Sequence, residues 1–199
     1  MTKPVSDTTK IPMFPLTIFP LPGELVPLHI FEPRYRQLLQ DAEKRDMGFG
    51  IYFNHVQNEE KLGSVVKLES VIKRYPGGEA DVIVKCIDLL KLHTLFRTFK
   101  DKMYPGGEVS LWNVDTTTPV NDKVESEFLE YLLLLKINQA ARQTSVYNIA
   151  VELNLSFEDR LKFVKLDPVK QETFLQSRMR YLGALLKEAE KARNVFHLN

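Results

Sequence analysis

The chain has 199 residues with a formal net charge of +1, and 44% of its residues are apolar while 27% are charged. This composition is typical of a globular protein with a hydrophobic core, so it excludes wholesale disorder. Basic and acidic side chains are spread evenly along the sequence. That distribution disfavours nucleic-acid binding, because nucleic-acid-binding proteins concentrate Lys and Arg to neutralise phosphates.

The N-terminal segment is polar and has no apolar signal region, and no run of about 18 apolar residues occurs in the sequence. We therefore expect no membrane association and a cytoplasmic location. Residues 1–10 are expected to form a disordered tail. We assign residues 11–118 to a β subdomain and residues 119–199 to a helical subdomain, because the composition changes from strand-like to helical around residues 116–121.

Prolines are concentrated near the start of the chain. Six of the eleven fall between positions 12 and 33, interleaved with large apolar residues. Proline removes a backbone donor and favours an extended predecessor, so this stretch predicts short strands at sheet edges and excludes a helix. After Pro33, apolar residues recur at helical spacing and predict a short amphipathic helix that ends between Asp46 and Gly48.

Six short strand-like runs follow, and they predict a compact antiparallel barrel or sandwich. They cover residues 49–53, 63–68, 70–74, 80–87, 91–99 and 108–114. The pentapeptide Tyr-Pro-Gly-Gly-Glu occurs at residues 75–79 and again at residues 104–108. Each copy predicts a tight turn before a strand. The alternative is that the two copies form paired rims that contact a ligand.

Four helices are predicted after residue 121. Asp122 and Glu125 have capping-box spacing and begin a well-buried helix, a second covers residues 147–153, and Ser156 caps a third. Asp167-Pro168 begins a long last helix that runs to about residue 194. Its apolar positions form one stripe, at Val169, Leu175, Met179, Leu182, Leu185, Leu186 and Ala189. The stripe favours packing within this chain, and its alternative is a homodimer through the last helix.

Catalytic motifs are absent from the sequence. It contains no P-loop, no Gly-x-Ser-x-Gly elbow, no dinucleotide fingerprint and no pair of histidines at metal-binding spacing. Cys86 is the only cysteine and lies in an apolar strand, where burial raises a thiol pKa and makes the thiol inert. We expect a protein that is not an enzyme and holds no metal and no cofactor. A small-molecule enzyme with its site in the barrel cleft is the least favoured alternative.

One segment carries a resemblance to a known family. Phe14-Pro15-Leu16, then Pro22-Gly23, then the run from Pro27 through Leu28, His29, Ile30, Phe31, Glu32, Pro33 and Arg34 to Tyr35 resembles the opening of the N-terminal substrate-binding domain of Lon proteases. The similarity extends over residues 11–190. It implies an α+β fold, with a PUA-like antiparallel β pseudobarrel followed by a C-terminal helical bundle that has a long last helix. The ATPase P-loop and the protease Ser-Lys dyad of Lon have no counterpart here, so the resemblance is to a stand-alone, ATP-independent form.

This resemblance, on a chain without catalytic motifs, implies a non-catalytic module that binds polypeptide segments or a protein partner, as an adaptor or regulator of protein quality control. The predicted substrate-binding residues are Phe31, Glu32, Arg34 and Tyr35. Phe31 has a core position as its alternative, and Glu32 and Arg34 have a local capping or pairing role. The alternative function is a PUA-like nucleic-acid-binding protein, for which the basic residues between Lys67 and Arg74, followed by Tyr75, are the nearest candidate surface.

Overall fold

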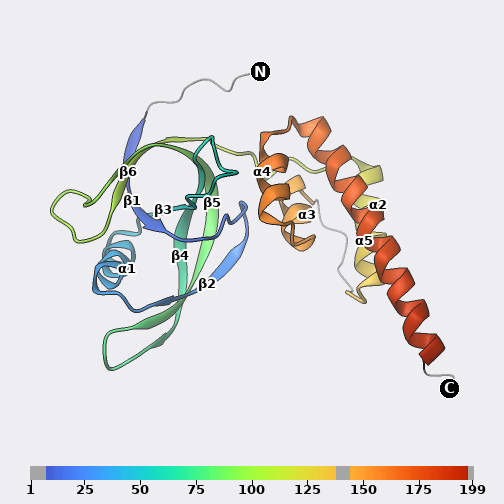
Figure 1. The fold of residues 1–199 in the computed structure, drawn as a ribbon, viewed down its shortest axis with the longest axis horizontal. Coiled ribbons are helices and arrows are strands. Elements are labelled where there is room, and N and C mark those ends of the chain that lie inside the picture. Colours follow the sequence, from blue (N-terminus) through green and yellow to red (C-terminus); the bar gives the residue numbers. More distant parts are fainter. Residues whose placement is uncertain (1–7, 138–143, 197–199) are drawn as a thin grey trace. The chain divides into compact units, whose positions relative to one another are not determined.

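The computed structural model describes residues 8–137 and 144–196, with side chains as far as residue 192. The chain divides into two compact units between Asp115 and Thr116. The first unit contains all six strands and helix α1, and the second contains helices α2 to α5 (Figure 1). The expected α+β class and the long last helix are confirmed.

The strands are β1 (Thr9–Pro15), β2 (Leu25–Ile30), β3 (Phe49–Tyr52), β4 (Leu62–Arg74), β5 (Ala80–Phe96) and β6 (Gly106–Leu111). The helices are α1 (Pro33–Arg45), α2 (Asp122–Leu134), α3 (Val146–Glu152), α4 (Phe157–Lys165) and α5 (Pro168–Phe196). Thr9 and Lys10, which were expected in the tail, belong to β1, while residues 1–7 of that expected tail lie outside the described residues.

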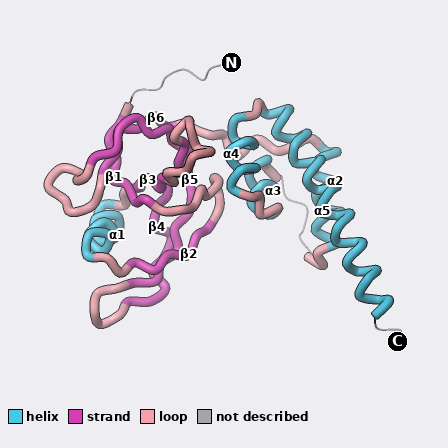
Figure 2. The backbone as a smooth tube through the Cα atoms, viewed as in Figure 1, coloured by secondary structure: helices cyan, strands magenta, loops and turns pink. Residues whose placement is uncertain are grey.

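The first unit is a barrel with one additional edge strand. The strand order is β2-β5-β4-β3-β1-β6, and β6 also pairs with β5, so five strands close on themselves while β2 stays at the edge (Figure 2). β1 and β3 are parallel, and the other pairs are antiparallel. The expectation of a wholly antiparallel barrel is therefore wrong at this pair. The connection from β1 to β3 includes β2 and α1, which gives it the length that a parallel crossover needs.

In two places, two strands predicted as separate form one continuous long strand. The runs at 63–68 and 70–74 are both part of β4, and those at 80–87 and 91–99 are both part of β5. Irregular register steps in the β4–β5 pairing, between Val65 and Val66 and again between Leu68 and Ser70, allow these long strands to bend around the barrel. Polar residues at such irregularities look like turns in the sequence, which is why the breaks were wrongly predicted.

The two copies of the pentapeptide have different roles. In the β4–β5 connection, Gly78 has a φ of +92° and its N–H donates to the Tyr75 carbonyl at 2.9 Å, so the predicted turn is confirmed there. The turn predicted for the second copy is wrong, because Gly106 and Gly107 belong to β6. A Cβ at Gly106 would lie 2.6 Å from the Phe99 ring, so this glycine permits close packing within the sheet.

The first unit has two groups of buried apolar residues. One lies inside the barrel and consists of Met13, Tyr52, Val65, Leu90, Leu92 and Val109. The other packs α1 against the sheet and includes Phe14, Ile30, Tyr35, Leu38, Leu39, Val82 and Val84. Beside the second group, the buried carboxylate of Asp41 on α1 accepts from the Tyr104 hydroxyl and lies 2.8 Å from the Lys102 ammonium. This contact fixes the β5–β6 loop on α1.

The helices of the second unit begin at polar caps. Helix α2 begins at Asp122 as predicted. Its cap is the Asn121 side chain, which accepts from the N–H groups of Lys123 and Val124, so the capping-box spacing placed the cap one residue too late. Ser145 caps α3, and Ser156 caps α4 as predicted.

Part of the predicted apolar stripe of α5 is buried in the second unit. Leu175 and Met179 are buried, whereas Val169, Leu185 and Ala189 are exposed. The stripe is therefore wrong as a packing face at Val169, and its far end, at Leu185 and Ala189, faces solvent. Phe174 contacts the Phe163 ring of α4, which the spacing did not indicate.

Candidate functional site

Alternate residues of β2 face solvent. Leu25, Pro27 and His29 are exposed, whereas Val26, Leu28 and Ile30 pack toward the core. Leu25 is 56% exposed, and Phe31, which continues the same spacing just after the strand, is 59% exposed. We call these four residues, Leu25, Pro27, His29 and Phe31, the β2 row. The two ends of the row are therefore large apolar side chains, Leu25 and Phe31.

The β2 row lies beside an unpaired strand edge. The Cys86 N–H donates to the Glu24 carbonyl at 2.9 Å, and hydrogen-bonded pairs alternate along an antiparallel ladder. Leu25, Pro27 and His29 therefore turn their main-chain polar groups away from β5. Within the described residues, no strand pairs with that side of β2. The free edge offers three carbonyls but only two N–H groups, because proline has none.

A hydrogen-bonded network fixes the imidazole of His29. Its Nδ1 lies 2.6 Å from Oδ1 of Asp81 on β5, and the Tyr75 hydroxyl donates to the other carboxylate oxygen at 2.7 Å. The bonds from Tyr75 and then His29 lower the pKa of Asp81, and the same carboxylate raises the pKa of Tyr75. The His29 ring stacks on the Phe31 ring with centroids 5.9 Å apart. The His29 side chain is 54% exposed, and its Nε2 atom lies on the opposite side of the ring from Nδ1 and Asp81.

The four residues predicted to bind substrate have separate roles. Glu32 is the N-cap residue of α1, and its carboxylate pairs with the Arg34 guanidinium at 2.8 Å. Arg34 lies over the Tyr35 ring, which is only 5% exposed and stacks on Phe14 with centroids 4.0 Å apart. The Tyr35 ring is therefore part of the core, and its predicted contact with a ligand stays a prediction. Phe31 belongs to the exposed row, and Glu32 and Arg34 form a pair beside it.

Basic side chains near the β2 row differ in their partners. Lys85 is exposed and lies directly opposite Leu25, and in the described part of the chain no carboxylate lies within ion-pair distance of it. Lys67, opposite Lys85 on β4, pairs with Asp46 at 2.8 Å. Lys85 is thus a cation opposite one end of the row that is available to a ligand.

Leu25 and His29 were not among the binding residues predicted from the sequence. One signal was present: residues 25, 26, 28, 30 and 31 are all large and apolar, so both faces of the strand are apolar. A strand with one solvated face would instead alternate apolar and polar residues. The pattern alone does not separate a strand covered on both sides from one with an exposed apolar face.

Other chemistry is limited among the described residues. Cys86 is buried as expected, its thiol lies 3.5 Å from the Pro20 carbonyl, and burial raises its pKa. Across residues 8–137 and 144–196, no group of three or more His, Cys, Asp and Glu side chains is arranged to hold a metal ion. None of the described helices combines the length and apolar character needed to span a bilayer.

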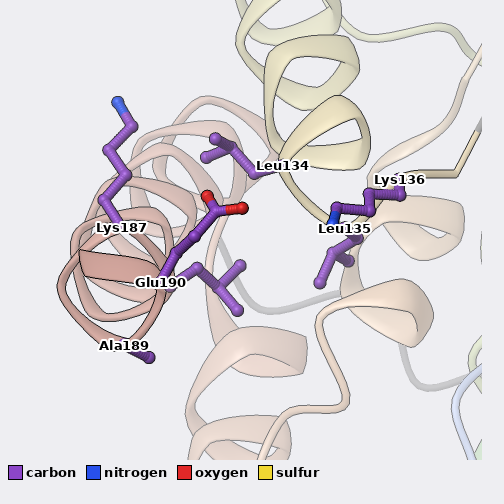
Figure 3. Close-up of a pocket in the computed structure, with 7 residues that line it drawn as sticks. Leu134, Leu135, Lys136, Lys187, Ala189 and Glu190 are labelled. Carbon is purple, nitrogen blue, oxygen red and sulfur yellow. The ribbon is translucent and has the colours of Figure 1, made fainter. Parts of the chain in front are cut away.

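The helical unit contains a groove. It has a volume of about 360 Å³ and lies between the end of α2 and the distal part of α5. Leu134, Leu135, Lys136, Leu186, Lys187, Ala189 and Glu190 line it (Figure 3). Leucine side chains and charged side chains both line this groove.

Comparisons with known proteins agree with the fold. The structure is similar to the Lon N-terminal domain protein from Xanthomonas campestris, with a TM-score of 0.62 and 23% identity over 88% of this chain and 98% of that one. It is also similar to the N-terminal domain of Mycobacterium avium complex Lon protease, with a TM-score of 0.55 and 14% identity over 86% of this chain and 98% of that one. The comparison with curated proteins gives no match.

The sequence comparison is more specific than the structural likeness. The family model of the ATP-dependent protease La (LON) substrate-binding domain matches residues 10–171, which include all of the barrel except Thr9, the β2 row and the start of α5. The match begins where the resemblance over residues 11–190 begins, and it ends at residue 171, within α5. The chain therefore belongs to the family of ATP-dependent protease La (LON) substrate-binding domains.

Proposed function

We propose that this protein is a non-catalytic polypeptide-binding module, and that its β2 row contacts apolar segments of unfolded or partly folded proteins. One observation carries the proposal: Leu25 and Phe31 are large apolar side chains, each more than half exposed, at the start and just after the end of the edge strand β2. Membership of a family of substrate-binding domains supports a polypeptide as the ligand class. In the cell such a module would act as an adaptor or regulator of protein quality control.

The two ends of the row supply the hydrophobic contact. Full burial of one such side chain contributes about 1.5 to 3 kcal/mol, so Leu25 and Phe31 each contribute a part of the binding free energy that offsets the cost of association. His29 lies between them with its ring held by Asp81, and it adds a hydrogen-bonding group at a fixed position. The row therefore combines apolar contact with one oriented polar group, the usual composition of a specific binding surface.

The described contacts favour polypeptide over nucleic acid. Of the basic residues between Lys67 and Arg74, Lys67 pairs with Asp46 and Arg74 pairs with Glu43 at 2.7 Å, while Lys73 lies over the Tyr75 ring. Cations that already have partners are poor ligands for phosphates, because binding a phosphate requires those contacts to break. These three basic side chains thus already interact with other side chains of this chain.

The test measures binding of two fluorescently labelled probes to the full-length protein by anisotropy. One probe is reduced, carboxymethylated lactalbumin, which is permanently unfolded, and the other is an octapeptide in which Thr alternates with Val, Leu and Phe. Leu25→Ser and Phe31→Ser are each expected to weaken binding about tenfold, because each removes one apolar side chain that the bound polypeptide would bury. A labelled RNA of mixed sequence serves as the probe for the alternative function.

Leu95→Ser is the matched control, because Leu95 is also a half-exposed strand leucine but lies outside the row. It is expected to leave the affinity unchanged. Equal weakening by Leu95→Ser and Leu25→Ser would remove the row from the proposal. No binding of either polypeptide probe, together with salt-sensitive binding of RNA, would overturn the function itself.

A further inference from the structure

We infer that the bound polypeptide is added to the sheet as an extended strand along the free edge of β2. This inference rests on the proposed function and goes further, because it names the conformation of the ligand and the main-chain groups that hold it. An exposed apolar row alone requires only side-chain contact. The unpaired edge beside this row adds a second set of binding groups.

The main chain of β2 has the geometry for such pairing. Glu24 is hydrogen-bonded to Cys86, so the alternation along the ladder directs the polar groups of Leu25, Pro27 and His29 outward. These groups lie on the side where the described chain provides no strand. A segment in extended conformation is the ligand that satisfies a row of alternating N–H and C=O groups, as in known cases of strand addition.

Pro27 limits the number of hydrogen bonds that β2 can donate to an added strand. It removes the middle donor, so an added strand receives hydrogen bonds from the N–H groups of Leu25 and His29 only. A proline on an edge strand also opposes continuous pairing with a second copy of the chain. The edge is therefore suited to reversible binding of short segments rather than to permanent association.

Side chains around the edge determine which segments fit. In a strand paired with β2, residues opposite Leu25 and His29 place their side chains on the same face as the β2 row, so alternate ligand residues contact the row. Apolar residues suit those positions because Leu25 and Phe31 are exposed there. Lys85 is on the neighbouring strand β5, directly opposite Leu25, and its side chain is long. A carboxylate at the end of the ligand near Leu25 is therefore favoured. The ligand is an extended, alternately apolar segment with an acidic residue near one end.

The experiment uses the Thr-alternating octapeptide, with one Glu at its end, and eight copies that each carry one backbone N-methyl group. N-methylation removes a donor and blocks strand pairing at one position only. If the peptide adds to β2, the affinity falls about tenfold or more at every second position and changes little at the others, because only alternate N–H groups face β2. Binding through side chains alone gives no such period and would overturn the inference while leaving the proposed function intact.

Two variants of the full-length protein complete the test. Pro27→Val restores the missing donor and is expected to tighten binding of the unmethylated peptide by about threefold to tenfold, with gel filtration confirming an unchanged size. Lys85→Glu is expected to weaken binding of the Glu peptide but not of its Gln analogue. If the unmethylated peptide does not bind, strand addition is overturned, and binding of unfolded lactalbumin then shows whether the proposed function stands.

Discussion

His29 of β2 and Asp81 of β5 face each other across the sheet, with Nδ1 of the imidazole 2.6 Å from Oδ1 of the carboxylate. They form a non-hydrogen-bonded pair in the ladder, the kind in which side chains approach most closely. Asp81 also accepts from Tyr75, so the carboxylate is held by residues from two other chain segments. The only polar side chain of the β2 row is thereby given one orientation.

Asp81→Asn is expected to weaken polypeptide binding a few-fold without unfolding the protein, because the amide holds the His29 ring less firmly. Asp81 acts through His29 and is a positioning residue. Binding measured from pH 5 to pH 8 for both proteins would reveal this role, since the variant should alter the pH profile as well as the affinity. Asp81→Glu, which keeps the charge, should restore part of the binding. A profile identical to that of the unchanged protein would exclude the positioning role.

Phe31→Ala and Tyr35→Ala should separate the binding surface from the core. Phe31 is 59% exposed, so its loss should reduce probe binding and change the free energy of unfolding by less than about 0.5 kcal/mol. Tyr35 is buried against Phe14, so its truncation should cost about 3 to 5 kcal/mol. Urea denaturation monitored by circular dichroism measures both effects. A large stability loss for Phe31→Ala would place its ring in the core.

Tyr104→Phe and Tyr75→Phe compare the equivalent tyrosines of the two pentapeptides. The Tyr104 hydroxyl donates to the buried carboxylate of Asp41 at 2.8 Å, so its removal should cost about 1 to 3 kcal/mol. The Tyr75 hydroxyl donates to Asp81 near the surface, where water replaces it, so the loss should be smaller. Equal losses in urea denaturation would contradict the difference in burial.

Stability is expected to fall in acid because of Asp41. Its hydrogen bond from Lys102 is the largest cause that lowers its pKa in the folded protein. A carboxyl group whose folded pKa lies below the unfolded value of about 3.9 stabilises the fold above that value and loses this contribution as pH falls through the folded pKa. Thermal unfolding should therefore shift to lower temperature below about pH 4. Asp41→Asn should be less stable at pH 7 and less sensitive to acid.

Self-association through α5 stays a prediction. Tyr181 and Leu185 are exposed on this helix, and Leu133 is exposed on α2. If these side chains form a contact between copies, sedimentation velocity should show a concentration-dependent dimer that Leu185→Glu abolishes. Val169→Glu is the control, because Val169 is exposed at the other end of the same helix. A monomer at every concentration would exclude the homodimer.

Much of the local structure could be predicted from the sequence. Prolines, glycines and apolar spacing located α1, the turn at Gly78 and the start of α4, because caps, turns and helical periodicity depend on neighbouring residues. The long strands β4 and β5 were predicted in pieces, since residues at register irregularities resemble turns. The second pentapeptide was misassigned because the packing of Phe99 on Gly106 joins residues that local pattern does not connect.

The sequence by itself determined the family resemblance and the absence of catalytic motifs, and it predicted Phe31 as a contact residue. Only the tertiary structure decided that Tyr35 is buried while Phe31 is exposed, because both are aromatic residues at one strand-to-helix turn and differ only in which side packs on Phe14. It also decided that β2 is an edge strand, since the partners of a strand come from distant segments of the chain. Exposure and pairing are properties of the assembled sheet, and residue order specifies them only through that assembly.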